Sequence, residues 1–384
     1  MHWIVTGLFA AVAFGWIALM IDVARGVPLI PLLRDVSPLE DAACPAVSIL
    51  FAARDEAEKL PGAIETFLAL DYPRYEVVAV NDRSEDATEE ILESAARRDA
   101  RLKVVRVSSL PAGWLGKPHA LEQAFEHSTG EWLVFTDADV HFSRDLLRRA
   151  VGLAAERGWD HLTLLSSAEM DTAGEKIALT FFATGFLLGI RPWRVSDSKS
   201  HFYAGVGAFQ LLRRSTYEAI GTHRRLAMEV VDDMKLGKLV KQGGFRSGVG
   251  RAFESVSVRW HSGVGNIVRG TTKNFFAAAE FRLPLAILQI LMLLTSCVLP
   301  FAALAVVRGW ALVFAGISAG IVVMIQAGVC VETGVSPVYA LTAPIGALIF
   351  CWMLTRSTIV TLWNGGVTWR GTFYALEELR RGVV

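Results

Sequence analysis

The sequence predicts an α/β domain with a mostly parallel sheet, flanked by transmembrane helices. Two observations support this fold class. Hydrophobic residues make up 53% of the 384 residues, and the excess is concentrated in long uncharged runs at the two ends of the chain. Between these runs, short apolar stretches alternate with helical patterns, which is typical of parallel strands joined by crossover helices.

Residues 1–24 are predicted to be a membrane anchor. The stretch from Trp3 to Ile21 carries no charge and is long enough to cross a bilayer core as a helix. A cleaved signal peptide is the alternative. No Lys or Arg precedes the apolar run and no clear small-residue cleavage site follows it, so a retained anchor is favoured.

Three further uncharged runs lie near the end of the chain: Leu283–Val307, Gly309–Val331 and Thr333–Thr355. Each exceeds the roughly 20 residues that a membrane span needs. They predict about three transmembrane helices within residues 283–362, followed by a tail at residues 363–384. Pro337 and Pro344 fall in the last run, where they would kink it or make it partly re-entrant.

The central domain, residues 45–262, contains four predicted strands: Ala46–Ala52, Glu76–Val80, Lys103–Val107 and Trp132–Phe135. Polar residues follow three of them. Arg54 and Glu56 follow the first strand, Asp82 the second, and Asp137 with Asp139 the fourth. Because the carboxyl ends of parallel strands meet at the edge where α/β sheets bind ligands, these side chains could face one cleft.

The acids suggest a nucleotide and a metal ion. Asp137 and Asp139 repel each other unless a cation lies between them, and Mg²⁺ or Mn²⁺ takes carboxylate oxygens. Asp82 could accept a hydrogen bond from a base or ribose, although an Asp without a ligand suits the turn equally well. Lys117 lies at a predicted helix start beside Pro118, where it would bind an anionic group or remain solvated.

Two later pairs are also candidates. Asp232 and Asp233 begin a predicted helix, where the helix dipole alone favours acids, but one of them could be a general base. Arg259 and Trp260 form a cationic and aromatic pair suited to a phosphate and a sugar. The same pair could simply close the domain against the membrane.

The charge distribution points to a membrane rather than to nucleic acid. The formal net charge is zero, which gives no general attraction for a polyanion. Basic residues gather near the predicted membrane boundary, where they fit an anionic cytoplasmic leaflet or are merely solvated: Arg191, Arg194, Lys199, Arg269, Lys273 and Arg282. The apolar stretch Ile177–Ile190 and residues 263–282 are therefore predicted membrane-interface segments, with a core helix as the alternative for the first. The four cysteines have no metal-ligand or disulfide spacing, which suits a domain facing the cytoplasm.

The order of these acids, followed by Arg259 and Trp260, resembles that of the family 2 inverting glycosyltransferases, which have the Rossmann-like GT-A fold. It is most similar to the membrane-bound, ceramide-glucosyltransferase-like branch and to bacterial relatives associated with hopanoid and carotenoid glycosylation. The resemblance covers roughly Ala46 to Asn274 and the tail stretch GVTWRGTFY.

The resemblance implies a role for each position. Asp233 would be the base that deprotonates the acceptor, with Asp232 beside it. Asp139 would be the more direct ligand of Mg²⁺ or Mn²⁺, with Asp137 shared between metal and nucleotide. The other residues expected to bind the nucleotide sugar are Arg54, Glu56, Asp82, Lys117, Gly205, Gly207, Arg259 and Trp260. In this assignment, the two glycines belong to a small-residue loop that lines the sugar pocket.

Two departures from the family pattern affect the prediction. Asp232 stands where the branch usually has Glu, which could shift the acceptor without removing the base. Val256 stands where polymer-forming synthases commonly have Gln or Arg, which disfavours polymer synthesis.

The predicted function is therefore the transfer of one sugar from a nucleotide sugar, expected to be a UDP-hexose, to a membrane lipid such as a hopanoid, a ceramide or a carotenoid. The site is expected at the cytoplasmic face of the inner (cell) membrane, in a multi-pass protein. A processive synthase and a non-catalytic membrane scaffold are the alternatives. The side of the tail is left open. Three further spans would place it outside, whereas Arg370, Arg380 and Arg381 favour the inside.

Overall fold

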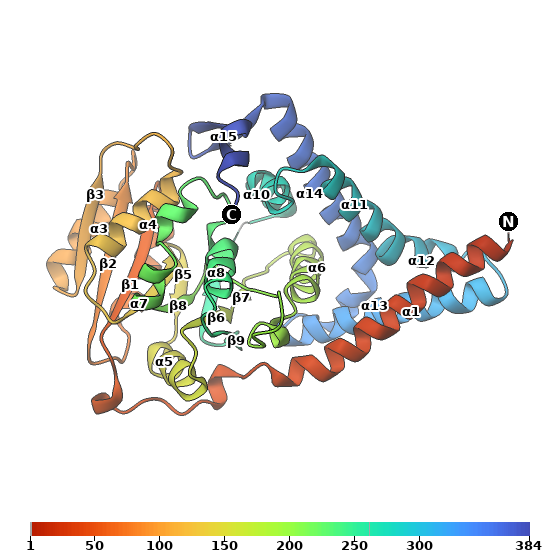
Figure 1. The fold of residues 1–384 in the computed structure, drawn as a ribbon, viewed down its shortest axis with the longest axis horizontal. Coiled ribbons are helices and arrows are strands. Elements are labelled where there is room, and N and C mark those ends of the chain that lie inside the picture. The colour runs from red at the N-terminus through yellow and green to blue at the C-terminus, as the bar shows by residue number, and fades with distance from the viewer. Residues whose placement is uncertain (1, 261) are drawn as a thin grey trace.

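A computed structural model describes residues 2–260 and 262–384 and confirms the predicted architecture. A sheet domain lies at one end of the molecule, and long helices form a wedge that narrows away from it (Figure 1). The first helix, α1 (His2–Gly26), runs along one side of this wedge. Helices α6 (Ala173–Ile190) and α10 (Asn274–Ala278) lie between the wedge and the sheet domain.

The central sheet has seven strands, in the spatial order β3 (Leu102–Val107), β2 (Tyr75–Asp82), β1 (Val47–Ala53), β4 (Trp132–Asp137), β8 (Gln210–Arg213), β6 (His161–Leu165) and β9 (Ser247–Arg251). Only β8 runs antiparallel to its neighbours within this described sheet. The four predicted strands correspond to β1 to β4. A small second sheet contains β5 (Val140–Phe142), β10 (Val256–Val258) and β7 (Ser167–Ala168).

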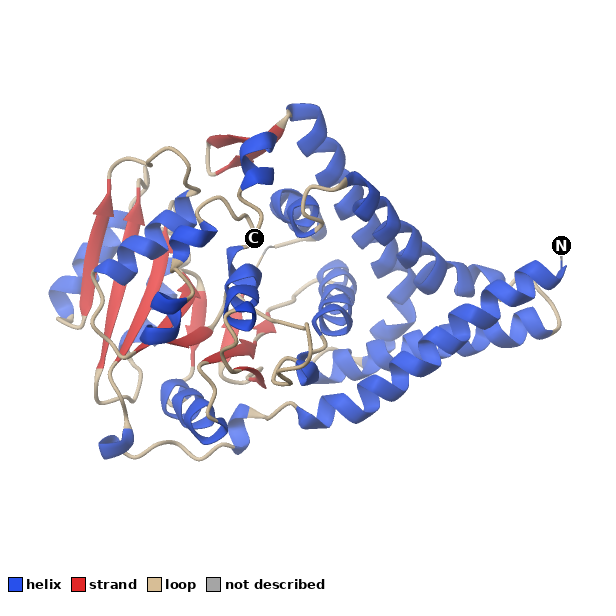
Figure 2. Cartoon of the chain, viewed as in Figure 1, coloured by secondary structure: helices blue, strands red, loops and turns tan. Residues whose placement is uncertain are grey.

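Helices cover both faces of the central sheet (Figure 2), which explains why its strands are apolar on both sides. Successive side chains of a strand point to opposite faces. Phe51 of β1 therefore packs against Phe67 of α2 (Leu60–Leu68), on the face that α5 (Leu146–Arg157) also covers. Leu50 packs on the other face. That face is covered by α4 (Gly116–Glu126), α7 (Arg214–Ala219) and α8 (Asp232–Gln242).

Among the described residues, five helices are long and apolar enough to cross a membrane: Trp3–Leu29, Ala173–Arg194, Leu283–Ala303, Trp310–Glu332 and Pro337–Asn364. Four of them match the predicted spans, and the fifth contains α6. The span after Leu283 consists of α11 (Leu283–Leu293), a π-helical segment (Leu294–Val298) and α12 (Leu299–Ala303). The next is α13 (Trp310–Glu332).

The last apolar segment differs from its prediction. A 3-10 helix (Pro337–Thr342) returns along α13, and only then does α14 (Ala343–Asn364) begin, with Pro344 in its first turn. In Figure 1, α14 crosses the wide end of the wedge instead of running to its tip. The predicted boundary at residue 362 falls just before its end.

The tail returns to the sheet domain. It forms a hairpin of β11 (Gly366–Trp369) and β12 (Thr372–Ala375), followed by α15 (Leu376–Arg381). Arg370 at the hairpin tip forms an ion pair with Glu56, which follows β1. The tail and the sheet domain therefore lie on the same side of the wedge, as the basic residues of the tail favoured.

Ion pairs join the sheet domain to the long helices. Asp22 near the end of α1 pairs with Arg194 and lies 3.4 Å from Arg191. On the other side, Arg251 at the end of β9 lies 3.0 Å from Glu332 of α13. Arg191 and Arg194, which were expected near the anionic leaflet, thus contact a carboxylate of the protein.

Candidate active site

The predicted site residues converge on one cavity of 1280 Å³ between the sheet domain and the long helices. Of the described residues, those that line it include all the predicted ones except Arg259: Arg54, Glu56, Asp82, Lys117, Asp137, Asp139, Gly205, Gly207, Asp232, Asp233 and Trp260. The strand ends explain this convergence. Asp82 ends β2 and Asp137 ends β4, and β1 lies between these two strands.

Asp82 is buried and is held by its neighbour in the chain. The guanidinium of Arg83 donates to both carboxylate oxygens, at 2.8 and 3.0 Å. Gly116, the first residue of α4, lies so close that an added Cβ would be 2.6 Å from Asp82 Oδ2. The carboxylate is therefore fixed at the sheet edge, where a nucleotide would meet it.

Asp137 and Asp139 are each bound by a lysine. Lys117 Nζ lies 2.6 Å from Asp137 Oδ1, and Lys59 Nζ lies 2.7 Å from Asp139 Oδ2. No group of three or more metal-ligating side chains occurs among the described residues. Two neighbouring carboxylates nevertheless fit Mg²⁺ or Mn²⁺, because such ions are often held by one or two carboxylates together with substrate phosphates.

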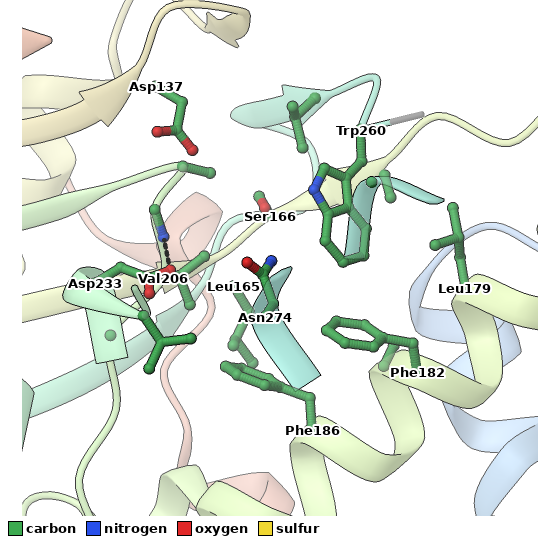
Figure 3. Close-up of a pocket in the computed structure, with 18 of the residues that line it drawn as sticks. Asp137, Leu165, Ser166, Leu179, Phe182, Phe186, Val206, Asp233, Trp260 and Asn274 are labelled. Carbon is green, nitrogen blue, oxygen red and sulfur yellow. Dashed lines mark hydrogen bonds between the residues drawn. The ribbon is translucent and has the colours of Figure 1, made fainter. Parts of the chain in front are cut away.

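Asp232 and Asp233 lie in the first turn of α8, where Asp232 is buried and Asp233 is half-buried. The backbone N–H of Gly207 donates to Asp233 Oδ2 at 3.0 Å (Figure 3), and that of Met234 donates to Oδ1 at 2.8 Å. Burial raises the pKa of both acids, that of Asp232 to about 7, while the ammonium of Lys117 opposes this effect. The backbone donors stabilise the ionised form of Asp233, so it is the better placed of the two to accept a proton.

The two predicted glycines are required by close packing. A Cβ on Gly205 would lie 1.8 Å from the carbonyl oxygen of Asp233. A Cβ on Gly207 would lie 2.8 Å from Asp137 Oδ2 and 3.3 Å from Asp233 Oδ2. The loop therefore holds the start of α8 against the end of β4, which brings Asp233 and Asp137 to one wall of the cavity.

Arg259 does not lie where the resemblance placed it. Its guanidinium points to the beginning of α6, where Nη1 is 2.6 Å from Asp171 and Nη2 is 3.9 Å from Glu175. Only its backbone takes part in the site, because its carbonyl oxygen accepts a hydrogen bond of 2.9 Å from Lys59. Glu175 and Thr172 form the capping box that starts α6, and this local structure fixes the carboxylate near the arginine.

Five cations that line the cavity were not predicted as site residues: Lys59, Arg251, Arg269, Lys273 and Arg370. Lys59 follows β1 by six residues, so its position after a strand end was a usable signal. Lys273 was expected at the membrane surface, but its Nζ lies 3.8 Å from the ring centroid of Trp369, and burial lowers its pKa to about 8. Its chain position near a predicted span gave no indication of this.

The cavity also has an apolar arm, formed by side chains of α1, α6 and α13: Met20, Val23, Leu179, Phe182, Phe186, Met324, Ile325 and Val329. The Trp260 and Phe182 rings both line the cavity, and their centroids are 5.1 Å apart. Figure 3 shows Phe182, Phe186 and Leu179 on α6, across the cavity from Asp137 and Asp233. The predicted interface segment Ile177–Ile190 therefore forms one wall of this arm.

Residues 48–218 match the family model described as glycosyl transferase family 2. A β-monoglucosyldiacylglycerol synthase from Synechocystis sp. is 34% identical over 152 residues, which cover 39% of this chain and 30% of that protein. A 4,4'-diaponeurosporenoate glycosyltransferase from Staphylococcus haemolyticus is 23% identical over 264 residues, covering 68% of this chain and 69% of that protein. The chain thus spans less than a third of the first of these relatives.

A solved structure shares the fold over nearly the whole chain. The mannosyltransferase PcManGT from Pyrobaculum calidifontis, in complex with GDP-Man and Mn²⁺, has a TM-score of 0.56 and 20% sequence identity. The likeness covers 94% of this chain and 99% of that one. The predicted GT-A fold is confirmed, and residues 48–218 form a glycosyl transferase family 2 domain.

Proposed function

We propose that the protein transfers a single sugar, with inversion, from a nucleotide-sugar donor to a hydroxyl of a membrane lipid. The observation that carries this proposal is that one cavity joins the strand-end acids to an apolar arm between α1, α6 and α13. A donor and an acceptor of opposite polarity could therefore meet in it. Two relatives named for a glucosylated diacylglycerol and a diaponeurosporenoate support an acceptor of this type.

The donor is assigned to the polar end. Asp82, with Arg54 and Glu56 from the loop after β1, would contact the nucleoside. A Mg²⁺ or Mn²⁺ ion held by Asp139 and Asp137 would offset the charge of the leaving diphosphate. The GDP-Man and Mn²⁺ in the mannosyltransferase structure support this choice of ligands. A UDP-hexose is the expected donor.

The two lysines would change partners when the donor binds. Lys59 and Lys117 neutralise Asp139 and Asp137 in the structure described here. A diphosphate offers the ammonium groups a second anionic partner and leaves carboxylate oxygens available to a metal ion. Metal and nucleotide should therefore increase each other's affinity, as linkage requires. Equal Mn²⁺ affinity with and without nucleoside diphosphate would contradict this assignment.

Asp233 is the proposed general base. Direct displacement at the anomeric carbon inverts its configuration and needs one group to take the acceptor proton. Asp233 is half-buried, is oriented by two backbone donors and lies on the same cavity wall as Asp137. The negative charge of Asp232 would raise the pKa of Asp233, and the positive charge of the nearby Lys117 would lower it.

The apolar arm would hold the hydrocarbon part of the acceptor, with its hydroxyl near Trp260 and directed toward Asp233. A hopanoid, a ceramide and a carotenoid all provide a long apolar body with a polar end. The arm lies between candidate membrane helices, which supports a position within the membrane. We assign the sheet domain to the cytoplasmic side of the inner membrane, where nucleotide sugars occur.

The test is the transfer of label from UDP-glucose, and then from other nucleotide sugars, into the lipid extract of membranes that contain the protein with Mn²⁺ or Mg²⁺. Label in a small lipid that is lost in Asp233→Asn is the expected result. Label in a high-molecular-weight product would favour a processive synthase. Binding of a nucleotide sugar with no transfer to any lipid would favour a non-catalytic scaffold.

A further inference from the structure

The expected diphosphate contact is missing from the cavity wall. Arg259 was predicted to hold the donor diphosphate, but its guanidinium is engaged by Asp171 and does not line the cavity. A leaving diphosphate carries charge that a bidentate arginine offsets better than a single ammonium does. Arg54 also lines the donor end but is assigned to the nucleoside, so the diphosphate would need a further arginine, and the tail provides Arg370.

Arg370 reaches the cavity from the tip of the β11–β12 hairpin. It lines the cavity and pairs with Glu56, although 314 residues separate the two in sequence. Glu56 itself is fixed, because its backbone N–H donates to Thr88 Oγ1 at 2.9 Å. The guanidinium is thus held beside the loop after β1, at the sheet edge that carries Asp82 and Asp139.

The backbone at Arg370 is unusual for an arginine. Arg370 and Gly371 have φ of +48° and +77°, and they form the two-residue loop between the paired residues Trp369 and Thr372. Positive φ at both positions is typical of hairpin loops that favour Asn followed by Gly. A long β-unbranched side chain at the first position gains nothing from this backbone, so the conformation points to a use for the guanidinium.

The hairpin is anchored firmly enough to position that group. Trp369 lies against the ammonium of Lys273, and Tyr374 on the opposite strand is buried. The backbone N–H of Leu376 donates to Gly365 O at 2.9 Å, which closes the base of the hairpin. Arg370 therefore extends from a fixed support rather than from a free tail.

We infer that Arg370 is a donor-binding residue whose guanidinium contacts the diphosphate of the nucleotide sugar, in the role expected for Arg259. This inference rests on the proposed function. Before the donor enters, Glu56 keeps the guanidinium in place, and the diphosphate then takes over as its partner. The hairpin would thereby complete the donor site with a residue from outside the matched family 2 domain.

The variant that tests this is Arg370→Asn, because Asn suits the positive φ and the hairpin should remain folded. Arg381→Asn in α15 is the control, since this arginine is 82% exposed and lies in the same tail. Binding of UDP and UMP in the presence of Mn²⁺ is measured by calorimetry on the detergent-solubilised full chain. For Arg370→Asn we expect roughly ten- to a hundredfold weaker UDP binding, with UMP binding much less affected. Arg370→Lys should restore part of the loss.

Unchanged UDP affinity in Arg370→Asn, or an equal loss for UDP and UMP, would overturn the inference. An equal loss would indicate that the hairpin only supports the nucleoside site. Failure of the proposed function is distinguishable, because the wild-type protein would then bind UDP but transfer no sugar, while the UDP and UMP comparison would still be readable. If GDP binds more tightly than UDP, GDP and GMP replace them in the same comparison.

Discussion

A phenylalanine at position 328 should block the apolar arm. Gly328 of α13 lines the cavity, and an added Cβ would meet no atom within 4 Å, so the ring can enter the arm without disturbing the helix. Gly320 lies on the same helix, has the same free space and does not line the cavity, which makes Gly320→Phe the matched control. Both changes replace a glycine in a helix interior, so their effects on helix stability should be similar.

The expected size follows from the apolar contacts that the acceptor would lose. A phenyl ring displaces roughly four methylene groups of a bound chain, at about 0.8 kcal/mol for each buried methylene. The total of about 3 kcal/mol corresponds to roughly a hundredfold lower kcat/KM for the lipid acceptor. The donor site lies at the polar end of the cavity, so UDP affinity should stay at the wild-type level.

The assay measures transfer of labelled sugar to lipid in detergent micelles at saturating donor, with the acceptor concentration varied. Gly328→Phe should lose acceptor kcat/KM while Gly320→Phe retains it. Equal kcat/KM in the two variants would show that the arm does not hold the acceptor. A matching loss of UDP affinity in Gly328→Phe would show that the ring disturbs the whole cavity, and would also refute the reasoning.

Three further predictions follow from the site and from the path of the chain. Gly207→Ala places a methyl group 2.8 Å from Asp137 Oδ2. It should lower kcat for transfer on the order of a hundredfold, while thermal unfolding should show that the fold is retained. Burial raises the pKa of Asp233, and its ionised form is needed to accept a proton. Transfer should therefore fall with decreasing pH, with a midpoint above the ordinary Asp pKa of about 3.9. A midpoint at or below that value would contradict the role of Asp233 as base. In membrane vesicles, Ser336→Cys and Phe373→Cys should react with an impermeant thiol reagent from the same side as the sheet domain, whereas Arg308→Cys should react from the other side. The native cysteines are all buried and give little background, and labelling of Phe373→Cys from the Arg308 side would contradict the described path of the tail.

The donor end of the site was predictable from sequence because it depends on local rules. Strands were recognisable as apolar runs, and the acids that follow them had to meet at one edge of a parallel sheet. Asp82 and Asp137 therefore lie where they were expected. The pair at the start of α8 was also recognisable, because a helix start is a local feature.

The remaining site residues depend on how distant segments pack. Lys273 and Arg370 enter the cavity only because α14 crosses the wide end of the wedge and the tail folds back onto the loop after β1. The basic residues of the tail indicated its side of the membrane, but no residue pattern indicated that these segments reach the cavity. The orientation of Arg259 also depends on such packing, since the start of α6 sets the position of its partner Asp171.

The proposed donor site and the proposed acceptor site also differ in how much of each lies within the family 2 match. The matched family 2 domain ends at residue 218, so it contains Asp82, Asp137 and Asp139 but neither Asp233 nor Arg370. The 34% identity to the diacylglycerol enzyme likewise extends over only 152 residues. The apolar arm takes two of its three walls, α1 and α13, from outside the family 2 match. Two proteins can therefore share the donor acids while their arms differ in length and width. The proposed lipid acceptor must therefore be sought from the shape of this arm, which Gly328 lines.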